Sequence, residues 1–163
     1  MIQQITRDER FLAMAKELGF DIYDENAAGG HYAPLLRHGD EVYVSGLVPR
    51  MNGEVQYPGR VGLELNMADA QEAASISAIR GLALIRGAIG SLDNVKALLR
   101  ITVYVKSTLD FVDLSEVANG ASDVLTHVLG DAGRHTRTTV GVYQLPKNAP
   151  IEIDMIAALH PSV

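Results

Sequence analysis

Two side chains in the last quarter of the sequence, Arg137 and Glu152, are of types that bind and transform small carboxylic acids. Arg137 lies in the alternating segment 136–144, and its planar guanidinium can bind both oxygens of a carboxylate. Glu152 alternates with isoleucines in segment 151–159, where a poorly solvated carboxyl group could act as a general acid or base. Structural roles stay open: Arg137 could pair with Glu152 or Asp154 on the next strand, and Glu152 could be a solvated carboxylate on an open sheet face.

The composition excludes several other kinds of chemistry. The chain has 163 residues and no cysteine, so disulfides, thiolate nucleophiles and cysteine-ligated zinc are ruled out. The histidines form no HExxH or similar close pair, and no phosphate-binding loop, dinucleotide-binding glycine pattern or GxSxG motif occurs. We therefore expect neither a metal nor a cofactor.

The charge balance and the start of the chain limit the partners. Fourteen Lys and Arg against twenty Asp and Glu give a net charge of −6, which argues against a nucleic-acid partner. The start lacks the apolar core of a signal peptide, and no apolar run is long enough for a membrane span. The expectation is a cytoplasmic protein with no membrane partner, and the absence of cysteine fits a reducing compartment.

A helix is predicted over 6–18, since Thr6 and Glu9 form a capping box ahead of an apolar stripe. We interpret residues 1–28 as an N-terminal helical extension and 29–163 as the main domain.

The main domain should be α+β, with a mixed sheet and two helices on one face. The other sheet face needs a cover, and a partner subunit would provide it. The long segment 49–66 contains several prolines and glycines and is typical of a functional loop. Period-two and helical patterns predict strands at 32–37, 41–47, 98–107, 136–144 and 151–159, and helices at 68–89 and 113–129.

Several segments, in this order, resemble the RidA/YjgF family of reactive-intermediate deaminases, also called endoribonuclease L-PSP-like. The end of the chain carries the family's arginine strand, a Leu-Pro connection and an alternating Ile-Glu-Ile strand. The similarity spans about 31–159, and segments 119–123 and 133–135 with the helical start are similar to a longer branch of the family. The matching segments are 42–46, 92–111, 137–147 and 151–157.

This resemblance implies a chorismate-mutase-like fold of the Bacillus type and a homotrimer with clefts between subunits. It implies hydrolysis of 2-imino or enamine acids, such as 2-aminoacrylate, to 2-keto acids and ammonia, without metal or cofactor. Arg137 matches the arginine that holds the substrate carboxylate, and Glu152 matches the carboxylate that positions or activates water. The positions matching substrate-binding residues are Tyr32, Ser45, Gly46, Asn119 and, through its backbone carbonyl, Thr139.

The sequence departs from the short family members near the cleft. Residues 31–34 read His-Tyr-Ala-Pro, and Leu47 stands where those members usually have glutamine. Both changes alter the polar contacts of the cleft, so two alternatives stay open. One is a non-catalytic protein that binds and senses a small carboxylate metabolite. The other is an endoribonuclease or translation inhibitor, which the net charge disfavours.

Overall fold

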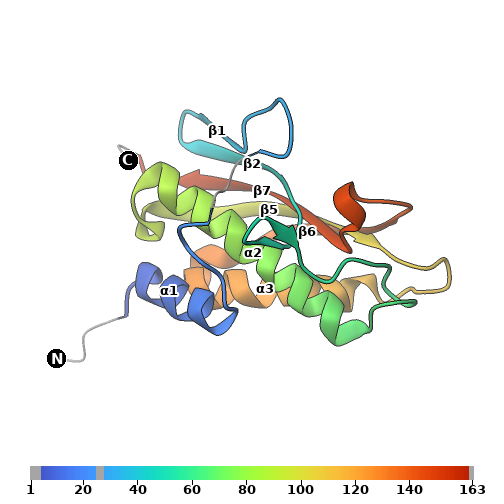
Figure 1. Ribbon diagram of the computed structural model, residues 1–163. Helices are drawn as coiled ribbons and strands as arrows, with labels where there is room; N and C mark the ends of the chain where they lie inside the picture. Colours follow the sequence, from blue (N-terminus) through green and yellow to red (C-terminus); the bar gives the residue numbers. More distant parts are fainter. Residues whose placement is uncertain (1–4, 25–27, 162–163) are drawn as a thin grey trace.

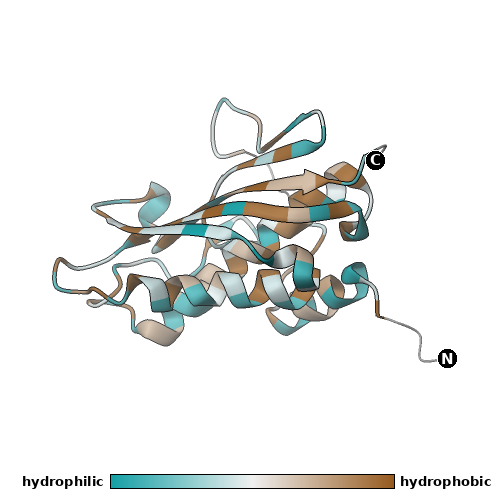
Figure 2. Cartoon of the chain, turned by 180° about the vertical axis from the view of Figure 1, so that it is seen from behind, coloured by the Kyte–Doolittle hydropathy of each residue, from teal (hydrophilic) through white to brown (hydrophobic). Residues whose placement is uncertain are grey.

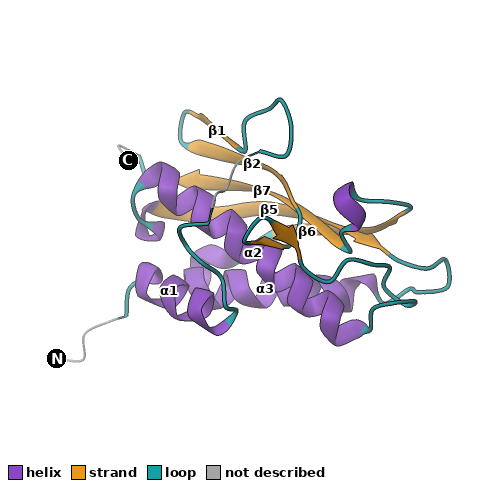
Figure 3. Ribbon diagram, viewed as in Figure 1, coloured by secondary structure: helices purple, strands orange, loops and turns teal. Residues whose placement is uncertain are grey.

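A five-stranded mixed sheet forms one layer of the fold, and the helices form the other (Figures 1 and 3). This computed structural model describes residues 5–24 and 28–161. All neighbouring strands pair antiparallel except β5 and β6, which pair in parallel. The strand order is β1 (Leu35–His38), β2 (Glu41–Leu47), β7 (Ile151–Leu159), β5 (Val95–Lys106) and β6 (Thr136–Val142).

Two long helices cover one face of this sheet, as predicted. These are α2 (Met67–Ile89) and α3 (Leu114–Leu129), which pack against each other below the strands in Figure 1. A third helix, α1 (Arg7–Glu17), packs on both of them and buries Phe11 in the common core. The predicted capping box begins α1: Thr6 Oγ1 accepts from the Glu9 amide at 3.1 Å, and Glu9 Oε2 accepts from the Thr6 amide at 2.7 Å.

The two faces of the sheet differ in burial. Along β7 the odd-numbered residues are buried against the helices, while the even-numbered residues, Glu152 among them, are half-buried on the other face. The strand that leads to the C-terminus is accordingly coloured largely hydrophobic in Figure 2. We call the face without helices the open face.

The first strand of the sheet and the segment 49–66 differ from their predictions. The first strand begins at Leu35 rather than at 32, because Pro34 cannot donate a ladder hydrogen bond and restricts the residue before it. Tyr32 therefore lies in a bend ahead of β1. The segment 49–66 is not a plain loop, because β3 (Arg50–Met51) and β4 (Glu54–Val55) form a small hairpin in it.

The described residues also form three short 3₁₀ turns, which are η1 (Leu92–Asn94), η2 (Gly130–Gly133) and η3 (Pro146–Asn148). No helix within residues 5–24 and 28–161 combines the length and the apolar character that crossing a membrane requires. The predicted division of the chain at residue 28 lies next to residues 25–27, which are outside the described part, and it stays a prediction.

Candidate functional site

Arg137 lies on β6 and faces α3. Its strand partner Ile101 is fully buried against the helices, so Arg137 shares that face of the sheet. Its Nη1 donates to Asn119 Oδ1 and to Ser122 Oγ, each at 3.0 Å, and its Nη2 donates to the carbonyl of Ser115 at 3.2 Å. Residues 115, 119 and 122 lie about one helical turn apart, so α3 presents all three acceptors on one face. These four residues, with Thr139, are named the arginine half-site.

The guanidinium of Arg137 keeps donors for a ligand. Three of its N–H bonds are used by the contacts within the described residues, and a guanidinium has five. Thr139 lies two residues along the same strand and therefore on the same face. Its Oγ1 is buried and has no hydrogen-bond partner in the described part of the chain. A carboxylate placed beside β6 could thus accept from Arg137 and from the Thr139 hydroxyl.

His135 fixes the orientation of Ser122, which in turn holds Arg137. His135 Nδ1 lies 2.6 Å from the carbonyl of Gly133, which can only accept, so Nδ1 carries the proton. In the neutral imidazole, His135 Nε2 then accepts a hydrogen bond that the Ser122 hydroxyl donates over 2.9 Å. The Ser122 oxygen is thereby left with its lone pairs toward Arg137, and the chain His135–Ser122–Arg137 is consistently oriented.

Glu152 lies on the open face, beside a cavity of about 210 Å³. Tyr32, Ser45 and Gly46 line the same cavity, and we call them together with Glu152 the glutamate half-site. Strand β2 breaks its register with β7 between Val44 and Leu47, and Gly46 lies within this break. Ser45 Oγ donates to the carbonyl of Ala33 at 2.7 Å and so fixes the segment that carries Tyr32.

The carboxyl group of Glu152 is poorly solvated. Its burial raises its pKa, and the nearby Asp154 carboxylate raises it further. Gly46 makes this position possible, since a Cβ at residue 46 would overlap Glu152 Oε1 and lie 2.9 Å from Cδ. The arrangement suits a group that accepts and returns a proton at a bound water.

We expect Gly46→Ala to leave the fold intact and to displace the Glu152 carboxyl group, because the overlap involves only the end of a flexible side chain. Any reaction in which Glu152 transfers a proton should then slow by about tenfold or more, since small displacements of a proton-transferring group are costly. The control is Gly87→Ala on α2, where a Cβ meets nothing within 4 Å. Equal turnover in both variants, with an unchanged melting temperature, would contradict this role of Gly46.

The two half-sites lie on opposite faces of one sheet. Glu152 on β7 pairs with Tyr104 on β5, and Tyr104 pairs in turn with Val140 on β6. Because paired residues on neighbouring strands point to the same face, Glu152 and Val140 share the open face. Arg137 points to the other face. The structural alternative for Arg137, a pairing with Glu152 or Asp154, is therefore wrong: Asp154 instead accepts from the hydroxyl of Tyr104 at 3.2 Å.

Sequence reasoning missed two kinds of residue. Ser122 and His135 support Arg137 only through tertiary contacts, which spacing does not reveal. Arg80 lines the cavity of the glutamate half-site from α2, although it is only 3% exposed. A signal for it existed, since an arginine interrupts a helix face that is otherwise buried, with Ile76 and Ser77 one turn before it. No group of three or more potential metal ligands occurs within the described residues.

The sequence and the fold of this chain are similar to those of known proteins. A family model described as "YjgF/chorismate mutase-like, putative endoribonuclease" matches residues 9–159. The protein TCP17 of Trypanosoma cruzi is 34% identical over 93% of this chain and 95% of its own length. The crystal structure of a protein of unknown function from Agrobacterium tumefaciens is 35% identical, with a TM-score of 0.84 over 94% of each chain. Escherichia coli TdcF with bound serine is 25% identical, with a TM-score of 0.62 over 82% of this chain and 92% of that one.

Proposed function

Because the chain belongs to the YjgF/chorismate mutase-like family, we propose that it hydrolyses reactive 2-imino and 2-enamino acids to 2-keto acids and ammonia. The observation that carries this proposal is the pair of half-sites. One presents a pre-oriented guanidinium with N–H donors to spare, and the other presents a carboxyl group whose pKa is raised. A carboxylate anchor and a proton acceptor are the two groups that hydrolysis of an imino acid requires.

In the proposed reaction Arg137 binds the substrate carboxylate and fixes the imine carbon. Ionised Glu152 accepts a proton from a water molecule as the water oxygen attacks the carbon of the protonated imine, which gives a neutral carbinolamine. The protonated carboxyl group then returns the proton to nitrogen. The C–N bond breaks as the hydroxyl group gives its proton to Glu152, and ammonia leaves as the keto group forms. No step needs a metal or a cofactor, and an enamine enters after tautomerisation to the imine.

The two half-sites can act together if they come from different copies of the chain. In a homotrimer with clefts between subunits, the arginine half-site of one copy would face the glutamate half-site of the next. The exposed apolar side chains near β6 and on the open face support such an interface. They include Tyr43, Leu109, Val112, Val140 and Tyr143, of which Leu109 and Tyr143 are almost fully exposed. A cytoplasmic location is also part of this proposal.

Mixed trimers test this arrangement directly. Chains with Arg137→Ala and chains with Glu152→Gln should each be inactive alone. When the two are unfolded together and refolded in equal amounts, every mixed trimer contains one cleft with both native residues. About one quarter of the wild-type activity should then return, as follows from random assembly with cyclic symmetry. Mixing without subunit exchange is the control, and activity that stays absent in verified mixed trimers would contradict the shared cleft.

The activity itself is tested by generating 2-aminoacrylate or 2-iminobutanoate in the assay and following the appearance of keto acid. Wild-type protein should accelerate its formation well above the spontaneous rate. A sensor of small carboxylates is the second candidate, favoured by the serine bound to the similar TdcF. It predicts that keto acids raise the melting temperature while keto-acid formation is not accelerated, and that result would replace the deaminase proposal.

A further inference from the structure

Among the described residues that line the cavity of the glutamate half-site, three are basic and one is acidic. The basic residues are Arg80, Arg50 and Lys147, and the acidic residue is Glu152. The proposed reaction uses none of the three basic residues. The three basic residues come from separate elements: Arg80 from α2, Arg50 from the β3–β4 hairpin, and Lys147 from η3. Their convergence on one small cavity is a feature of the tertiary structure.

Arg80 is the most informative of the three. Its side chain is 3% exposed, and its Nη1 donates to the carbonyl of Val48 at 2.5 Å. No carboxylate of the described residues forms an ion pair with it, since the one pair found there joins Arg86 and Asp8. Burial, together with the nearby Arg50 guanidinium, lowers the pKa of Arg80 to about 10. A buried cation without a counter-ion is costly, and a bound anion would offset that cost.

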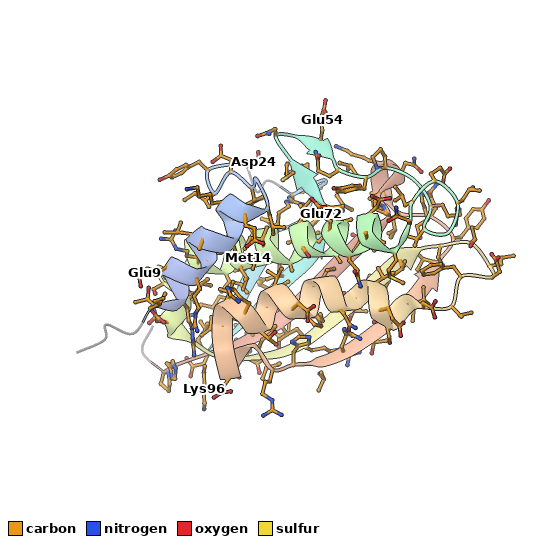
Figure 4. The ribbon with its side chains drawn as sticks, turned by 90° about the horizontal axis from the view of Figure 1, so that it is seen from below. Glu9, Met14, Asp24, Glu54, Glu72 and Lys96 are labelled. Carbon is orange, nitrogen blue, oxygen red and sulfur yellow. The ribbon has the colours of Figure 1, made fainter. Side chains whose placement is uncertain are left out.

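Asp24 and Glu152, the acidic residues near Arg80 in the described part of the chain, do not fill this role. The carboxylate of Asp24 acts on Arg80 only through space, and its Oδ2 accepts from the amide of Asn52 at 2.8 Å. Figure 4 shows Asp24 beside the hairpin that carries Glu54. The pKa of Glu152 is raised, by burial and then by Asp154, and no basic residue contributes to its shift. Glu152 and Arg80 therefore line one cavity without neutralising each other.

We propose that Arg80 binds a second carboxylate of the substrate, so that the natural substrate is an imino or enamino acid with two acidic groups. This inference rests on the proposed function, in which the first carboxylate is held by Arg137 of a neighbouring copy and the imine carbon lies at Glu152. The side chain of the substrate then extends into the cavity, and its terminal carboxylate meets Arg80, with Arg50 and Lys147 close by. A cavity of about 210 Å³ accommodates a short side chain of this kind.

The test compares two imines generated in the assay by amino-acid oxidases, 2-iminosuccinate and 2-iminobutanoate. Wild-type protein should have the higher kcat/KM for the dicarboxylic imine. Arg80→Met should lower the ratio of the two kcat/KM values by about 100-fold, since the loss of a buried charge partner has effects of that size. If Arg80→Met folds poorly, Arg80→Lys provides the second test. This variant keeps the charge and should retain part of the preference for the dicarboxylic imine.

The matched control is Arg86→Met on the same helix, because Arg86 pairs with Asp8 away from the cavity. It should keep the wild-type ratio. A merely structural Arg80, which only ties α2 to Val48, would lower both kcat/KM values together and leave their ratio unchanged. That outcome would overturn the inference while the deaminase proposal stands.

A binding measurement separates the two proposals. Succinate should bind wild-type protein at least about tenfold more tightly than butyrate by calorimetry, and Arg80→Met should remove the difference. If no imine is hydrolysed, this result would still support the dicarboxylate site. Equal binding of succinate and butyrate would overturn it, and so would binding of inorganic phosphate in preference to succinate.

Discussion

Arg137→Ala is expected to lower kcat/KM for 2-iminobutanoate by about 100-fold or more, as the loss of a charge-assisted, bidentate carboxylate contact does. The reason lies in the pre-orientation of the side chain. Asn119, Ser122 and the Ser115 carbonyl already hold the guanidinium, so binding costs little side-chain entropy. Keto-acid formation under limiting imine measures the effect.

Arg134→Ala is the matched control, since Arg134 is an exposed arginine three residues before Arg137. It should retain wild-type turnover. Arg137→Lys should recover little, because an ammonium group cannot reproduce the planar fork. If Arg137→Ala keeps its activity while remaining folded, Arg137 is not the carboxylate anchor, and the proposed reaction loses its first step.

Glu152→Gln is expected to reduce turnover by about 100-fold to 10,000-fold, the range of general acid–base catalysis. For wild-type protein, kcat/KM should rise with pH as Glu152 ionises, and the midpoint should lie above the ordinary pKa of a glutamate because burial and Asp154 raise it. The residual activity of Glu152→Gln should lack this dependence. A pH profile recorded with both proteins measures the difference.

The stability of the same variant provides a check on folding. A raised pKa means that folding favours the protonated carboxyl group. The stabilisation is complete below the unfolded-state pKa and is lost as the pH rises through the folded-state value. At pH 7 the neutral glutamine should therefore melt at or above the wild-type temperature. A pH profile unchanged by Glu152→Gln would exclude Glu152 as the proton acceptor.

The sequence predicts those parts of the fold that depend on local periodicity. The bounds of β2 and β7 agree with the predicted 41–47 and 151–159, because turn residues flank both strands. The alternation is regular along β7, whereas in β2 it is interrupted between Val44 and Leu47. The capping box of α1 is likewise a local pattern. The family resemblance is confirmed over most of the chain, and with it the α+β fold.

The candidate site could be predicted only as a set of residues. The alternation of β6 separates Arg137 from Val140, but the parallel pairing with β5 decides which face meets the helices. The support of Arg137 by Ser122 and His135, and the exposure of Arg80 to a cavity, depend on contacts between distant segments. In the sequence, Arg80 is only a charged residue within the apolar pattern of α2. The tertiary packing is what places its side chain in the wall of the cavity.

The contiguity of the arginine half-site has a consequence for amide hydrogen exchange. All of its residues belong to the β5–α3–β6 segment, within 95–142, whereas the glutamate half-site combines segments before β5 with β7. A ligand held by Arg137 alone would slow exchange in α3 and β6 only. A ligand that spans a cleft between copies would slow exchange in β2 and β7 as well. One exchange experiment on the unmodified protein thus reports how many half-sites a ligand engages.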